Sequence, residues 1–185
     1  QILEVSMPRL SVVSRDSLSP ENQQSYDSIV ASRGAVRGPF AAIMHSPELA
    51  GRAAHLGTYV RFGSTVPRLQ NELAILTVAR HWDADYEWVA HEIEAKEAGA
   101  RLDAIAAIGN RTAPDGLSEE EALTVTFALE LLQDHKVSDK TFNAVKDKLG
   151  EQGVTDLTAT VGYYSFISCV LNSMEMLPEK TTLPR

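Results

Sequence analysis

Apolar residues recur every three or four positions along most of the chain, which is the spacing that places them on one face of an α-helix. The clearest example is the stripe formed by Leu69, Leu73, Leu76 and Ala79. No segment shows the sustained alternation of apolar and polar residues that would mark a strand. The pattern therefore predicts an all-α protein.

Helix-starting signals divide this pattern into separate helices. Ser19 and Ser46 each precede a proline and a glutamate, so a capping residue, a first-turn proline and an acid stand together. Ser118, followed three residues later by Glu121, forms a capping box. The predicted helices cover residues 20–32, 47–62, 67 to at least 79, a start after Asp83 or Asp85 to about 99, 102–108, 119–133, 139–150 and 154–174.

The same signals predict how the chain is organised. We expect one domain over residues 1–185, with its core at about 20–172 and two packed halves that meet at the turn-rich segment 110–116. The polar, proline-containing tail 175–185 is expected to be loosely held or packed on a neighbour. The uncharged run 157–174 contains several hydroxyl and amide side chains, which is typical of a buried helix and not of a membrane span.

Composition narrows the functional classes. The 185 residues carry a formal net charge of −8, which argues against binding to nucleic acid or to anionic membranes. Residues 1–10 lack the apolar core of a signal peptide, so we expect a cytoplasmic protein with a small-molecule partner. Cys169 is the single cysteine, which excludes a dithiol cycle within one chain; its apolar neighbours predict a buried thiol.

The strongest candidate chemistry is a carboxylate and an imidazole on one helix. Glu87 and His91 are four residues apart, so they share a helix face with Cβ atoms roughly 6 Å apart. A carboxylate beside an imidazole favours the charged ring, which suits a general acid/base pair. Glu72, among apolar residues of the preceding helix, is a candidate to orient His91 or to relay a proton. The alternatives are an exposed helix pair and a surface glutamate.

Three further residues are candidates to contact a substrate. Arg80 is eight residues after Glu72 and within about 80° of the same helix face, so it could hold a carboxylate with two hydrogen bonds or form a structural salt bridge. Tyr86 could donate to a substrate oxygen or simply pack. Trp88, together with Trp82, could form apolar walls of a pocket.

Metal and cofactor sites are not predicted. A zinc site needs three or four ligands, and Glu72, Glu87, His91 and possibly His55 could in principle converge. The chain has no His-Glu-x-x-His run and no thiolate cluster, phosphate loop, dinucleotide fingerprint or serine elbow.

The stretch from Glu72 to His91 resembles the carboxymuconolactone decarboxylase and alkylhydroperoxidase-D-like superfamily. Peroxidase members of that superfamily carry a Glu, a Cys-x-x-Cys that begins twelve residues later, and a His four residues after the second Cys. Glu72, Ala84, Glu87 and His91 stand at these positions here. The run Ala-Asp-Tyr-Glu-Trp-x-x-His over 84–91 is similar to the cysteine-free, decarboxylase-named branch, and 38–49 resembles the lead-in.

This resemblance implies an orthogonal multi-helical fold, assembled as a homo-trimer or homo-hexamer. It also implies a cofactor-free lyase of aromatic catabolism that acts on a small organic acid or lactone. His91 would then donate the proton, Glu72 would hold its tautomer, and Glu87 would be a second acid/base. A non-catalytic binding or assembly module on the same scaffold is the alternative. Peroxide reduction is disfavoured, because both cysteine positions of the motif are occupied by other residues.

Overall fold

The chain is all-α, as the apolar periodicity predicts, in a computed structural model that describes residues 5–6 and 9–184. The described strands form one two-residue antiparallel pair, in which Val5 lies opposite Pro178 and Ser6 opposite Leu177. The elements in chain order are β1 (Val5–Ser6), η1 (Arg15–Ser17), α1 (Pro20–Arg33), α2 (Pro39–Ile43), α3 (Pro47–Thr58), the π-helix η2 (Tyr59–Gly63), α4 (Arg68–His81), α5 (Asp85–Glu97), α6 (Leu102–Gly109), α7 (Glu119–Gln133), α8 (Asp139–Ser173) and β2 (Leu177–Pro178).

Three predicted helix starts are confirmed by capping hydrogen bonds, whereas Ser46 precedes α3 without one. The side chains of Ser19 and Ser138 each accept a hydrogen bond from a backbone N–H in the first turn. Ser118 and Glu121 form both bonds of a capping box. The structure differs from the prediction in two places. The helix predicted over 47–62 ends as α3 at Thr58 and continues as η2, and α2 was not predicted.

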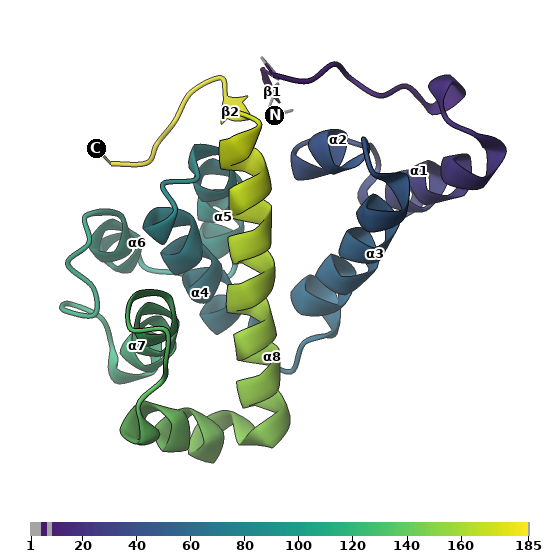
Figure 1. Cartoon of the computed structure of the whole chain (residues 1–185). Helices are drawn as coiled ribbons and strands as arrows, with labels where there is room; N and C mark the ends of the chain where they lie inside the picture. Colours follow the sequence, from purple (N-terminus) through teal and green to yellow (C-terminus); the bar gives the residue numbers. More distant parts are fainter. Residues whose placement is uncertain (1–4, 7–8, 185) are drawn as a thin grey trace.

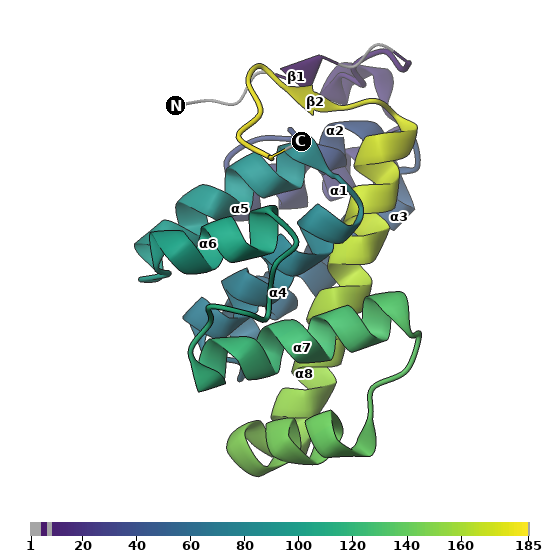
Figure 2. The same ribbon diagram turned by 90° about the vertical axis from the view of Figure 1, so that its left-hand side faces the viewer.

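Helix α8 lies in the middle of the molecule, with α1–α3 on one side and α4–α7 on the other (Figure 1). Helix α4 packs against α5, α6, α7 and α8, so the helices on both sides of segment 110–116 share it as a support. Figure 2 shows α6 and α7 in front of α4, with α1–α3 at the back. Every residue of α4 from 71 to 79 is buried. A helix enclosed on all sides carries no polar face.

Helix α8 is two helices joined at a bend, as the sequence predicts. Gly150 has φ 72° and ψ 179°, a left-handed backbone conformation that glycine adopts without a side-chain clash. By length and composition, α8 is the one described helix that could cross a membrane. This is weak evidence, because just over half of its most apolar window, 56%, is buried inside the protein.

Two expectations about burial are wrong. Cys169 is exposed, because it follows the buried Ser168 by one residue, which turns it about 100° away from the packed face of α8. Of the two alternatives for the tail, the loosely held one is wrong over its described part, 175–184, whereas packing on a neighbour stays a prediction. Met176 and Leu183 are buried, and the Thr181 hydroxyl donates a hydrogen bond to Asp85 on α5.

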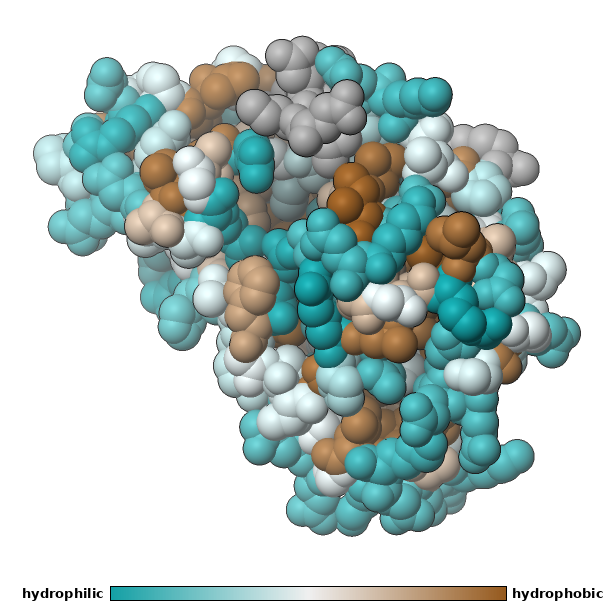
Figure 3. Space-filling view, turned by 180° about the vertical axis from the view of Figure 1, so that it is seen from behind, coloured by the Kyte–Doolittle hydropathy of each residue, from teal (hydrophilic) through white to brown (hydrophobic). Residues whose placement is uncertain are grey.

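The surface seen from behind is mostly hydrophilic, with apolar residues in separate clusters (Figure 3). Leu56 and Tyr59 are partly exposed near the end of α3, and Phe62 in η2 is 70% exposed. The homo-trimer or homo-hexamer stays a prediction.

Candidate active site

The three predicted acid-base side chains meet in the interior of the molecule. His91 Nδ1 lies 2.7 Å from Glu72 Oε2, and His91 Nε2 lies 3.2 Å from Glu87 Oε2. Each of the three residues is at most 5% exposed. Both nitrogens of the imidazole therefore face carboxylates, one from α4 and one from the preceding turn of α5.

This arrangement favours the charged imidazole. Burial alone would lower the pKa of His91. The hydrogen bonds and negative charges of Glu72 and Glu87 have a larger, opposite effect, so the pKa rises to about 9. Two acceptors satisfy both N–H groups of an imidazolium, whereas a neutral ring has only one N–H to donate. His91 is therefore protonated at neutral pH.

His91 and Glu87 line a cavity of about 470 Å³, and Glu72 lies behind them. The cavity lies between α1, α2 and η2 on one side and α5 and α8 on the other. The Tyr164 ring meets the His91 ring edge to face, with centroids 4.9 Å apart. The full lining consists of Ser32, Arg33, Ala35, Arg37, Pro39, Phe40, Arg61, Phe62, Tyr86, Glu87, Ala90, His91, Glu94, Tyr163, Tyr164 and Ile167.

The π-helix η2 is fixed in place by buried polar side chains. Asp156 on α8 is 4% exposed and accepts hydrogen bonds from the Tyr59 hydroxyl, at 3.0 Å, and from the Thr65 amide, at 2.8 Å. Asn71 on α4 donates to the Val60 carbonyl at 3.0 Å. These bonds hold the chain at both ends of η2. Because a π-helical turn contains more residues than an α-helical turn, η2 presents side chains in directions that a continued α3 would not.

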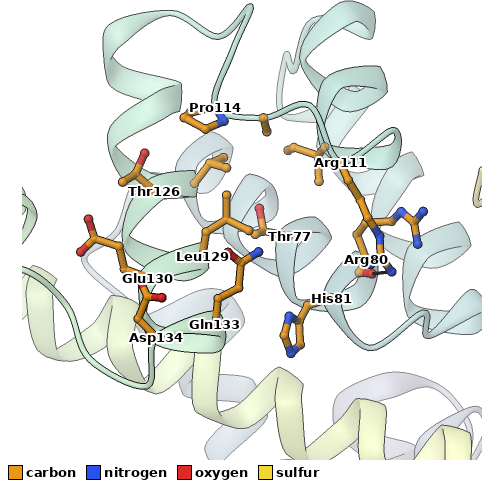
Figure 4. A pocket seen from close by; sticks show the side chains of 13 residues that line it. Thr77, Arg80, His81, Arg111, Pro114, Thr126, Leu129, Glu130, Gln133 and Asp134 are labelled. Atoms are coloured by element: carbon orange, nitrogen blue, oxygen red, sulfur yellow. Dashed lines mark hydrogen bonds between the residues drawn. The ribbon is translucent and has the colours of Figure 1, made fainter.

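Arg80 does not line the cavity with Glu87 and His91, so the expected substrate contact there is wrong, whereas the alternative of a structural salt bridge is observed with Asp83. Eight residues add about 12 Å of rise along a helix, which carries Arg80 to the far end of α4. Its Nε donates to the Gly109 carbonyl and its Nη1 pairs with Asp83. It lines a second cavity of about 400 Å³ between α4, α6 and α7, to which His81 and Gln133 also contribute side chains (Figure 4).

The tryptophans also lie away from the cavity, contrary to expectation. Trp88 follows Glu87 by one residue, so its side chain points about 100° away, into the core with Leu76 and Ile108. Trp82 is 39% exposed at the end of α4. Among the predicted substrate contacts, Tyr86 does line the cavity, and burial raises the pKa of its hydroxyl.

Sequence reasoning missed the arginines of the cavity. Arg33 ends α1 and Arg61 lies in η2, and both guanidinium groups reach the lining. The two arginines are far apart in the sequence, so no motif spacing connects them. A basic residue in the last turn of a helix is also expected from its favourable interaction with the helix dipole, so Arg33 did not stand out as a binding residue. The tyrosine pair Tyr163 and Tyr164, expected in the core or at an interface, lines the cavity as well.

A metal site is not evident in the part of the chain that the structure describes, since no group of His, Cys, Asp and Glu side chains there has a suitable arrangement. Both His91 nitrogens point at carboxylate oxygens, so the triad offers a metal ion no free imidazole lone pair.

The fold is that of the alkylhydroperoxidase-D-like proteins. One solved structure that shares it is described as an alkylhydroperoxidase AhpD core, an uncharacterized peroxidase-related protein from Ralstonia eutropha JMP134. It matches with a TM-score of 0.77 and 15% sequence identity, over 95% of this chain and 94% of its own. Another is an uncharacterized peroxidase-related protein from Silicibacter sp. TM1040, with a TM-score of 0.69 and 15% identity, over 96% and 92%. No family model and no curated protein sequence matches the chain. Identities this low show the fold alone, and the cysteine-free branch stays a prediction.

Proposed function

We propose that this chain is an enzyme, a cofactor-free lyase of the decarboxylase type, that transfers a proton to a small organic acid or lactone in the cavity beside α8. The observation that carries the proposal is the buried imidazolium of His91, held between two carboxylates at the wall of a 470 Å³ cavity. Cavities of this size are typical of small-molecule sites. Placing one cation between two anions in a core is costly, which favours a chemical role over a purely structural one.

The three residues have different parts in this mechanism. Glu72 does not line the cavity and holds Nδ1 from behind, so it is a positioning residue. His91 and Glu87 both line the cavity, and they are the groups that can exchange a proton with a bound molecule. A pKa of about 9 keeps the proton on His91 at neutral pH until a stronger base forms beside it.

Decarboxylation would form such a base. When the bond to the carboxyl carbon breaks, CO₂ leaves and the electron pair passes into a conjugated carbonyl as an enolate. The proton of His91 Nε2, directly or through Glu87, then adds to one carbon of the enolate, and water returns a proton to His91. The apolar part of the lining, Phe40, Phe62 and Ile167, disfavours the solvated carboxylate and so promotes its loss.

Two other functions have less support. A binding module has no need of an ionised histidine in its cavity, and the cavity is not filled by side chains. The similar structures are named peroxidase-related, but the single thiol of this chain, Cys169, is exposed on α8 and does not belong to the cavity lining. Proton transfer therefore remains the function that the geometry supports best.

The test is a panel of lactones and carboxylic acids assayed in D₂O for CO₂ release and deuterium uptake. We expect one member to be turned over with one deuteron added. The His91→Ala variant should lose roughly 10²–10⁴-fold in turnover. His81→Ala is the matched control, since His81 lies outside this cavity and should not affect turnover. Circular dichroism checks that each variant is folded. Unchanged turnover in a folded His91→Ala variant would remove His91 from the mechanism and refute the proposal.

A further inference from the structure

The lining of the cavity holds two arginines whose guanidinium groups are only partly paired. Arg33 Nη2 donates to the Ala54 carbonyl at 3.2 Å, and Arg61 Nη2 lies 3.2 Å from a Glu94 oxygen. The Nε atoms of both arginines are buried and have no hydrogen-bond partner among the described residues. A buried N–H without a partner is costly, and a guanidinium is suited to bind an oxyanion with two N–H groups at once.

Aromatic rings hold both guanidinium groups in position. Arg33 Cζ lies 4.3 Å from the centre of the Phe40 ring, and Arg61 Cζ lies 5.0 Å from that of Phe62. Contact with a ring face engages the flat side of a guanidinium and leaves the N–H groups at its edge available. Arg61 is further held by the hydrogen-bonded ends of η2.

The positive charge of Arg61 acts on Arg33. Burial lowers the pKa of Arg33, Tyr163 opposes this effect, and the charge of Arg61 lowers the pKa further. Burial also acts to lower the pKa of Arg61, but nearby acidic groups such as Tyr164 and Glu94 outweigh this effect, so the pKa of Arg61 is raised. Two like charges on one wall of a partly enclosed cavity repel each other. A negative group bound between them would relieve this repulsion.

The lining of the cavity carries more positive than negative charge. Arg33, Arg37, Arg61 and the His91 imidazolium are positive, whereas Glu87 and Glu94 are negative. Outside the lining, Glu72 behind His91 and Arg68 beside Glu94 add one charge of each sign. The excess of positive charge stands in a chain whose formal net charge is −8. The local excess of positive charge is therefore a specific property of this cavity.

We infer that Arg33 and Arg61 together bind an anionic oxygen, and that the cavity takes a small, negatively charged substrate. This inference rests on the proposed function only in calling the bound molecule a substrate. A charge of minus one is conserved when a carboxylate becomes CO₂ and an enolate. The pair of arginines would bind the oxygen on which that charge appears, opposite the His91 proton.

The probe is 4-nitrophenol, a planar analogue of an enolate whose ionised form absorbs visible light and whose neutral form does not. We expect the wild-type protein to bind the ionised form and to lower the pKa of the phenol. Arg33→Gln and Arg61→Gln should each weaken this binding about ten- to a hundredfold, the range for a hydrogen bond to a charged group. Arg52→Gln is the matched control, because Arg52 is exposed on α3 and pairs only with Glu48 among the described acids.

Neutral probes test the requirement for a negative charge. We expect 4-nitroanisole, which cannot ionise, to bind at least tenfold more weakly than 4-nitrophenol, and benzoate to displace 4-nitrophenol better than neutral benzamide does. Binding of 4-nitrophenol in its neutral form, equal binding of 4-nitroanisole, equal displacement by benzamide, or full affinity in both folded arginine variants would each overturn the inference. Arg33→Lys, which keeps the charge but loses the fork of N–H groups, covers the case in which Arg33→Gln does not fold.

The outcomes separate this inference from the proposed function. Phenolate binding that depends on Arg33 and Arg61, without turnover that depends on His91, would refute the proposed function alone. Turnover that depends on His91, without phenolate binding, would refute the inference alone.

Discussion

The charged state of His91 predicts how the stability of the protein depends on pH. The pKa of this ring is raised from the ordinary value of 6.5 to about 9 in the folded state. A tenfold change in proton affinity corresponds to about 1.4 kcal/mol, so the folded state gains about 3 kcal/mol from holding this proton. Since folded domains are typically stable by about 5–15 kcal/mol, a loss of this size is readily measured.

The sign follows from the direction of the pKa shift. A group whose pKa is raised on folding contributes its full stabilisation below its unfolded pKa and loses it as the pH rises through the folded value. Most of the 3 kcal/mol is therefore present at about pH 6.5 and is lost as the pH rises through about 9. The carboxylates of Glu72 and Glu87 are then left buried without a cation between them.

Urea unfolding of the wild-type protein and of His91→Gln across this pH range gives the measurement. The difference in unfolding free energy between the two should shrink by about 3 kcal/mol, because other groups that titrate in alkali are common to both. Nitrogen NMR of the ring gives a direct check, and both ring nitrogens should still be protonated at pH 8 or so. Parallel stability curves, or a ring that titrates near its ordinary pKa, would refute the idea that two carboxylates hold an imidazolium.

Three further changes test the surroundings of the site. Glu72→Gln should lower the pKa of His91, measured by NMR titration, and a pKa of about 9 in that variant would contradict the role of Glu72 as the partner of Nδ1. Gly57→Ala would place a Cβ 2.1 Å from the Tyr163 hydroxyl, so the ring must move and 4-nitrophenol affinity should change; an unaltered affinity would show that the tyrosine does not shape the cavity. Asp156→Ala removes the hydrogen bonds at the ends of η2 and should cost about 1.5–3 kcal/mol in urea unfolding, whereas wild-type stability would argue against that anchoring.

The helices and part of the site were predictable because they depend on local spacing. Glu87 and His91 share a face in any regular helix, so their contact follows from four residues of separation. Ser118 and Glu121 likewise predict a helix start that needs no tertiary partner. The solvent-exposed side of α8 was harder to predict, because a helix with few charged residues is apolar on both faces. Cys169 lies on the face that is not covered by other helices and is exposed to solvent.

The remaining parts of the site depend on tertiary packing. Arg80 and Glu72 lie on a similar face of α4 but about two turns apart along the helix axis. The periodicity of the sequence indicates which face a residue occupies, but not which tertiary neighbours lie at that level of the helix. Arg33 and Arg61 come from α1 and η2, and they line one cavity because α1 packs against α3, which continues into η2. The π-helix itself follows from the hydrogen bonds of residues far apart in the chain, which no local pattern reveals.

The position of Glu87 connects the fold to the proposed chemistry. By the spacing of the motif, Glu87 stands where the resembling peroxidases carry their second cysteine, and here it lines the cavity beside His91 Nε2. A carboxylate can accept and release a proton but cannot form the disulfide on which a dithiol cycle depends. A carboxylate at this position is therefore compatible with the proposed proton transfer between Glu87, His91 and a bound molecule, and not with a dithiol cycle. The single thiol of the chain, Cys169, is exposed elsewhere on α8 and does not line the cavity, which leaves the three acid-base side chains as the basis of the proposed chemistry.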